Sequence, residues 1–171
     1  MPSLSSVVRS PTHTGALLAA LCASLVGGSF FVQHVLLVEP CPLCIVQRFT
    51  YAALALVFLA VALLGRRARA QRGLLWLALV LVLAGGGVAA YQSQLQLFPV
   101  AEAATCSPSL SYMLDTLPVN EVIGQLFQAH GDCSDTSFKI VGLTLAQISL
   151  AIFTGLLLWL VPALRRRPPE P

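Results

Sequence analysis

Four long apolar stretches limit the folds that this sequence can adopt. They cover residues 15–38, 45–64, 74–95 and 140–164. A helix needs about 20 apolar residues to cross a bilayer, and backbone groups in lipid have to be hydrogen-bonded within the protein. Each stretch is therefore predicted to span the membrane as a helix, the third only if it continues past Ala90 toward Leu97. The expected fold is an all-α membrane protein, a four-transmembrane-helix bundle forming a single domain over residues 1–171.

The composition agrees with burial in lipid. Only 10% of the 171 residues are charged and 57% are hydrophobic, whereas soluble domains carry about 25% charged residues. The net charge of +3 is too small and too clustered to indicate a nucleic-acid partner. We therefore expect the lipid bilayer to surround most of the chain.

The first stretch has an alternative interpretation as a cleaved signal peptide, because Arg9 precedes it and small residues lie within it. However, the apolar run continues to Val38, which is too long for the hydrophobic region of a typical signal. A lipoprotein signal is also disfavoured, since Leu21 precedes Cys22 where the peptidase needs a small residue. The first stretch is therefore predicted to remain as a membrane anchor.

The basic residues predict the orientation of the helices. Arg9 precedes the first stretch, and the other basic sites follow the second and fourth stretches: Arg66, Arg67, Arg69, Arg72, Arg165, Arg166 and Arg167. With four spans, all of these sites lie on one side, which an excess of basic residues marks as cytoplasmic. Both termini are then cytoplasmic, and loops 39–44 and 96–139 are periplasmic. The chain is expected to be a multi-pass membrane protein.

The second periplasmic loop contains apolar residues at helical spacing. They form two groups separated by Pro118: Leu110, Met113, Leu114 and Leu117, then Val122, Ile123, Leu126 and Phe127. Each group is too short to span a bilayer, so we expect short amphipathic helices lying on the membrane surface. The alternative is an irregular loop with scattered apolar residues.

The strongest chemical signal is the sequence Cys41-Pro42-Leu43-Cys44 at the start of the second stretch. A Cys-x-x-Cys pair at the start of a helix can close a small disulfide that exchanges readily. Pro42 suits the first helical position, where its missing N–H is not needed. The partial positive charge of a helix N-terminus favours the thiolate, which is the reactive form of cysteine. Cys41 and Cys44 are therefore predicted to be a catalytic redox pair.

Arg48 lies one helical turn after Cys44, on the same face of the predicted helix. An arginine stays charged in a poor dielectric, and a cation within a membrane helix is expensive and usually functional. Arg48 can stabilise a Cys44 thiolate and polarise the oxygen of an electron acceptor such as a quinone. The alternative is an interfacial arginine that extends to lipid headgroups.

The remaining cysteines allow several interpretations. Cys106 and Cys133 lie in the second outer loop, where they can form an ordinary stabilising disulfide or take part in exchange with the first pair. A zinc site built from all four loop cysteines is a further alternative. Haem attachment would need a histidine after Cys44, where Ile45 stands. Cys22 lies inside an apolar stretch and is predicted to be a small packed hydrophobe.

An ordered set of motifs along nearly the whole chain resembles the disulfide bond formation protein B (DsbB) family. The motifs are Gln33-His34, Cys41-Pro42-Leu43-Cys44, Gln47-Arg48, Leu95-Gln96-Leu97-Phe98-Pro99 before Cys106, Gly131-Asp132-Cys133 and Gly142-Leu143. The four apolar stretches, with cysteine pairs in both outer loops, complete the pattern. A Cys-x-x-Cys pair alone would be a weak signal, but this ordered set is specific.

The resemblance implies a quinone-dependent protein thiol oxidase of the bacterial inner membrane. A reduced periplasmic thiol oxidase resembling DsbA would attack the loop disulfide, so that Cys106 forms the mixed disulfide with this partner. Cys133 would then exchange with Cys41, releasing a Cys44 thiolate that donates electrons to ubiquinone or menaquinone. Arg48 matches the arginine that lies near the quinone in this family. The resemblance implies no metal.

Three departures from the family pattern, and two other functions, remain open. Gln92-Ser93 stands where members often carry a histidine, Phe138 where a tryptophan is common, and Ala146 where a proline is common. These changes affect the expected quinone contacts and loop docking rather than the cysteine chemistry. The alternative functions are a redox enzyme resembling vitamin K epoxide reductase and a non-enzymatic membrane scaffold with structural disulfides.

Overall fold

The computed structural model consists mainly of four long helices. It describes residues 11–37, 41–64, 68–98, 116, 118, 121, 139–140 and 142–165. The four helices are α2 (Pro11–Val35), α3 (Pro42–Leu64), α4 (Ala68–Leu97) and α8 (Leu145–Arg165). All four are long and apolar enough to cross a membrane. This confirms the predicted fold class, a four-helix membrane bundle.

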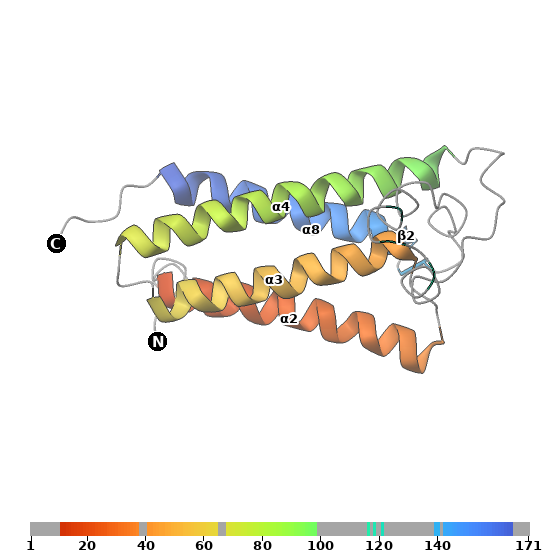
Figure 1. The fold of residues 1–171 in the computed structure, drawn as a ribbon, viewed down its shortest axis with the longest axis horizontal. Helices are drawn as coiled ribbons and strands as arrows, with labels where there is room; N and C mark the ends of the chain where they lie inside the picture. The colour runs from red at the N-terminus through yellow and green to blue at the C-terminus, as the bar shows by residue number, and fades with distance from the viewer. Residues whose placement is uncertain are drawn as a thin grey trace.

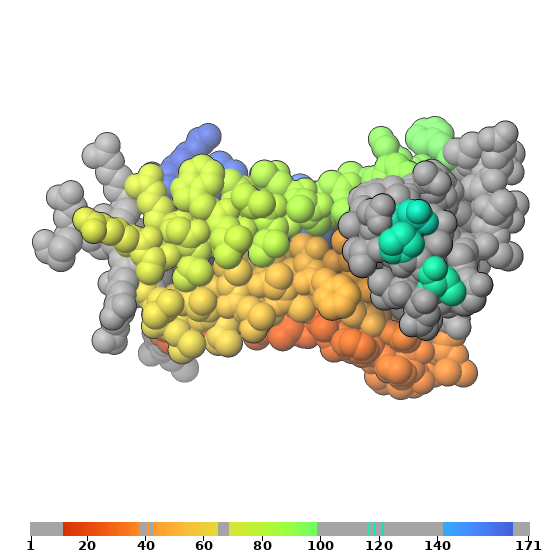
Figure 2. Space-filling view, in the orientation of Figure 1, coloured from red at the N-terminus to blue at the C-terminus, as the bar shows by residue number. Residues whose placement is uncertain are grey.

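The four helices run side by side along the length of the molecule (Figure 1). Helix α2 packs against α3, α3 against α4, and α4 against α8. The start of α2 and the end of α8 lie at the same end of the bundle (Figure 1). On the face seen in Figure 2, the side chains of α3 and α4 meet along most of their length. Helices α3 and α4 therefore form a central pair, which carries most of the candidate site.

Aromatic residues fill the centre of the bundle. The Tyr51 ring of α3 stacks on the Phe153 ring of α8 with 4.6 Å between their centroids. About two turns further along, Phe58 and Trp159 pack edge to face, with 6.4 Å between their ring centroids. Many large apolar residues instead point outward, such as Leu63 at 75% and Leu158 at 71% exposure. An outer surface of this kind is expected where the solvent is lipid.

Glycine allows α2 to approach α3 closely. A Cβ atom at Gly15 would lie 2.9 Å from the backbone nitrogen of Ala62 and 2.9 Å from the carbonyl oxygen of Phe58. Because both neighbours are backbone atoms, neither can move without shifting a helix. Small residues at such crossings are typical of membrane helices, where close van der Waals packing drives association.

The helix bounds differ from the apolar stretches by a few residues. Helix α2 ends at Val35 instead of residue 38, and α3 begins at Pro42 instead of residue 45. Helix α4 reaches Leu97, so the extension that the third span needed is present. Leu37 has a φ of 53°, so α2 ends inside an apolar run, whereas polar and basic residues extend both ends of α4. Hydropathy alone therefore places these ends poorly.

The last helix begins later than its apolar stretch because a short hairpin and a cap precede it. Strand β1 (Lys139–Ile140) pairs antiparallel with β2 (Leu143–Thr144). Gly142 turns the chain with a φ of 81°. The Gln147 backbone N–H donates to the Thr144 hydroxyl at 3.3 Å, and the Thr144 N–H donates to Gln147 Oε1 at 3.1 Å. This reciprocal capping box fixes the start of α8 at Leu145.

Several predictions concern residues outside the described part of the chain. Cys106, Cys133 and Phe138 belong to this group, as do the two apolar groups of the second loop. The relay role of the loop cysteines and the surface helices of this loop therefore stay predictions.

Candidate active site

Cys41 caps the N-terminus of α3, and Cys44 lies in the first turn of this helix. Cys41 immediately precedes the helix, Pro42 is its first residue, and the Ile45 N–H donates to the Cys41 carbonyl at 3.2 Å. The Cys44 N–H donates to Cys41 Sγ at 3.3 Å, so this sulfur occupies the place of a capping side-chain oxygen. Both cysteines are thiols, and Cys41 Sγ donates to Cys44 Sγ at 2.7 Å. The local helix geometry thus holds the two sulfurs together.

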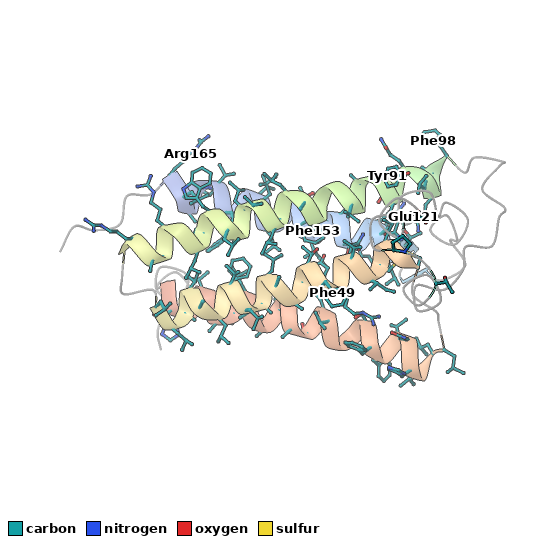
Figure 3. All side chains as sticks on the ribbon, in the orientation of Figure 1. Phe49, Tyr91, Phe98, Glu121, Phe153 and Arg165 are labelled. Carbon is teal, nitrogen blue, oxygen red and sulfur yellow. The ribbon has the colours of Figure 1, made fainter. Side chains whose placement is uncertain are left out.

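Side chains from α4 cover this pair. Cys41 and Leu43 are buried, and they pack with Cys44 against Val88, Tyr91 and Leu95. Tyr91 lies toward the end of the bundle opposite Arg165 (Figure 3). The site therefore lies at the end of the bundle opposite Arg165, and apolar side chains of α4 line one side of it.

Two buried glutamines connect α3, α4 and the sulfurs. Gln47 Nε2 donates to Gln92 Oε1 at 3.0 Å. Gln92 Nε2 in turn donates to Cys41 Sγ at 3.2 Å and to Cys44 Sγ at 3.3 Å. Sequence reasoning treated Gln92 only as a departure from a common histidine and missed its contact with the cysteines. The available signal was the pair of amides inside two otherwise apolar spans.

Arg48 turns from α3 toward α2. Its NH1 group donates to Gln33 Oε1 at 2.7 Å, and its NH2 group donates to the Ser29 carbonyl at 3.3 Å. The guanidinium also lies over the Phe30 ring. Among the described residues, no hydrogen bond joins Arg48 to Cys44. The guanidinium is held by α2, one turn away from the redox pair.

One atom of Arg48 stands out. Its Nε is buried and has no hydrogen-bond partner within the described structure. A buried N–H without a partner is costly, so native sites usually supply an acceptor. An oxygen of a bound molecule is one acceptor that fits this position.

The structure brings together three of the five predicted site residues, namely Cys41, Cys44 and Arg48. The other two, Cys106 and Cys133, lie outside the described residues. Cys22 is fully buried in the main apolar cluster, as expected for a packed hydrophobe. Ala146, another departure from the family pattern, is buried at 1% exposure near the start of α8.

Comparison with known proteins decides the family. The sequence profile of the family described as "Disulfide bond formation protein DsbB" matches residues 11–163. The chain belongs to the DsbB family. Among similar proteins, "Disulfide bond formation protein B" of Aromatoleum aromaticum is 39% identical over 150 residues, covering 88% of this chain and 90% of the relative. "Disulfide bond formation protein B 1" of Pseudomonas aeruginosa is 35% identical over 150 residues, covering 88% and 92%.

Membership of the DsbB family gives the chain a general role. The chain is a disulfide oxidoreductase of the disulfide bond formation system, as the family and the names of its relatives indicate. Its four apolar helices and the bacterial family make it a multi-pass inner-membrane protein.

Proposed function

We propose that this protein is a quinone-dependent protein thiol oxidase that re-oxidises a periplasmic DsbA-like dithiol partner. The observation that carries the proposal is the arrangement at the start of α3. A dithiol of one buried and one partly buried cysteine is followed one turn later by Arg48, whose buried Nε has no acceptor in the described structure. A thiol pair beside an unused cationic donor suits electron transfer to an acceptor that carries a carbonyl oxygen.

The residues at this site fit a quinone. The Arg48 Nε–H can donate to a carbonyl oxygen, and the Phe30 ring and the apolar residues around Cys44 suit a flat apolar ring. Gln33 and Ser29 hold the other nitrogens of Arg48, so the guanidinium stays in place whether or not a ligand is bound. A bound ubiquinone or menaquinone would supply the capacity to accept two electrons and two protons.

The proposed exchange begins in the second periplasmic loop. A thiolate of the partner attacks the Cys106–Cys133 disulfide and forms a mixed disulfide with Cys106, which frees Cys133. The second partner thiol then resolves this bond and leaves the partner oxidised. Cys133 attacks Cys41, and the bonding electron pair of the Cys41–Cys44 disulfide leaves on Cys44. Cys106 then attacks Cys133, which reforms the loop disulfide and leaves Cys41 and Cys44 as a dithiol. These roles for Cys106 and Cys133 rest on the family pattern.

The proposed orientation places both termini in the cytoplasm. Arg69 and Arg165 lie near the helix ends that meet the start of α2, and basic residues favour the cytoplasmic side. Cys41 and Cys44 lie at the opposite end of the bundle, which would face the periplasm. Disulfides persist in that compartment, so the orientation agrees with the proposed chemistry.

Anaerobic mixing of the purified protein with reduced DsbA and a quinone tests the proposal. Quinol should form together with oxidised DsbA in a ratio of one to one, because each disulfide carries two electrons. Omitting the protein, or replacing Cys44 by Ala, should stop quinol formation. Oxidation of DsbA without quinol formation would exclude the quinone as the electron acceptor. If DsbA is not oxidised and no quinol forms, the disulfides have a structural role only.

A further inference from the structure

The amide of Gln92 lies against both sulfurs of the redox pair. Gln92 is 2% exposed on α4, and Gln47 is 6% exposed on α3. Buried amides need hydrogen-bond partners, and polar residues within membrane helices are frequently functional. The partners of these two amides are each other and the sulfurs of Cys41 and Cys44.

Gln47 fixes the orientation of the Gln92 amide. Since Gln47 Nε2 donates to Gln92 Oε1, the Gln92 nitrogen faces the two sulfurs with both of its hydrogens. The opposite orientation would place the amide oxygen against sulfurs that carry no proton in a disulfide or a thiolate. Only the observed orientation offers a hydrogen-bond donor to the disulfide and to the thiolate, because an amide oxygen has no hydrogen to donate.

We propose that Gln92 is a catalytic hydrogen-bond donor to the Cys41–Cys44 pair, and that Gln47 is the positioning residue that directs it. When an incoming thiolate bonds to Cys41 Sγ, the Cys41–Cys44 bond breaks and its electron pair leaves on Cys44. The Gln92 N–H is already placed to stabilise that thiolate. The exchange needs no other reactant, and this inference rests on the proposed function because it assumes that the pair cycles.

The donor discriminates between redox states because hydrogen bonds to an ionised acceptor are roughly twice as strong as those between neutral groups. A disulfide sulfur is neutral and a weak acceptor, so the Gln92 N–H stabilises the reduced thiolate more. Removing the donor should therefore make the pair harder to reduce. A neutral amide achieves this without placing a second charge beside Arg48.

Gln92→Met tests the donor, because methionine has a similar length and no N–H group. The background is the full chain with Cys22, Cys106 and Cys133 replaced by Ser or Ala, so that only the Cys41–Cys44 pair titrates. The equilibrium with dithiothreitol is measured in detergent at neutral pH, without quinone or partner. We expect the equilibrium constant for reduction to fall about tenfold, which corresponds to about 30 mV.

Gln96→Met is the matched control. Gln96 lies one turn further along α4 and accepts a hydrogen bond from the Thr144 hydroxyl at 2.6 Å, so Gln96→Met removes a polar contact between α4 and β2. In Gln96→Met, the equilibrium constant for reduction of the Cys41–Cys44 pair should stay within about twofold of the parent value. Gln92→His, which retains one N–H donor, should restore most of the loss. Equal constants for Gln92→Met and Gln96→Met would overturn the proposal.

Gln47→Met keeps the test decisive if Gln92→Met does not insert into the membrane. It leaves the sulfur contacts in place but frees the Gln92 amide to rotate, so we expect a shift of about two- to threefold in the same direction. An unchanged constant would overturn the positioning role. Because quinone and partner are absent from this measurement, failure of quinol formation in the parent protein would refute the proposed function separately.

Discussion

The guanidinium carbon of Arg48 lies 4.3 Å from the centre of the Phe30 ring, so this positive charge on α3 lies against an aromatic face of α2. This contact and the two hydrogen bonds to Gln33 and Ser29 hold the side chain toward α2. An arginine that served only as an interfacial anchor would extend to water or headgroups instead. The observed position therefore favours a role within the site.

Replacing Arg48 by Lys should weaken quinone use although the charge is kept. Lysine has a compact ammonium group without the planar set of donors, and it cannot supply Nε–H beside the other contacts. A charge-assisted hydrogen bond contributes roughly 1.5–3 kcal/mol, so its loss should raise the apparent quinone KM about 10- to 100-fold. Steady-state quinol formation at varied quinone concentration measures this change.

Arg48→Ala should separate the two half-reactions. In the proposed relay the loop cysteines capture the partner, so single-turnover oxidation of DsbA should stay close to normal while quinone reduction slows. Arg69→Ala is the control, because Arg69 is exposed on α4 at the other end of the bundle. Equal loss in both half-reactions would indicate faulty insertion. Loss in neither would remove Arg48 from the site.

Gly15→Ala should destabilise the bundle. The added Cβ would lie 2.9 Å from two backbone atoms of α3, so α2 has to move away along its contact with α3. Overpacking of this kind typically costs about 1–3 kcal/mol. Gly27→Ala is a matched control on the same helix, since a Cβ there meets nothing within 4 Å. Thermal unfolding in detergent should show a lower Tm for the first variant only.

Phosphatase fusions test the orientation of the helices. Alkaline phosphatase folds only in the periplasm, so a fusion after residue 165 should be inactive. A fusion placed in the loop between α4 and α8 should be active, because this loop joins the ends that carry the redox site. The reverse pattern would place the Cys41–Cys44 pair in the reducing cytoplasm and contradict the proposed chemistry.

The four helices could be predicted from the sequence because each has the length and hydrophobicity that a helix needs to cross a bilayer. The sequence also placed Cys41, Cys44 and Arg48 at the start of one helix, since their spacing is local. The start of α8 was harder, because Ile140 and Leu143 continue the apolar run although Thr144 caps the helix. The Thr144 and Gln147 signature was readable but lay inside that run.

The glutamine pair could not be predicted from the sequence. Gln47 and Gln92 are 45 residues apart, and their contact depends on how α3 and α4 are rotated and shifted against each other. Hydrophobic periodicity does not fix this register when a helix is apolar on every side. The contact of Arg48 with Gln33 likewise depends on how α2 and α3 are rotated and shifted against each other. Interhelical polar contacts therefore required the packed structure.

The relay through the second loop predicts a trapped intermediate. If Cys106 is the residue that captures the partner, Cys133→Ala mixed with oxidised DsbA should accumulate a disulfide between Cys106 and DsbA. The Cys106 thiolate attacks the DsbA disulfide, one DsbA sulfur leaves as a thiolate, and the Cys133 thiol that would displace DsbA and close the loop disulfide is absent. Non-reducing electrophoresis after acid quenching detects this species, and dithiothreitol should release it. The matched variant Cys106→Ala should trap no partner through the same position. A variant lacking both cysteines that still oxidised DsbA at full rate would show that electrons enter directly at Cys41, and would reduce the second pair to a structural disulfide.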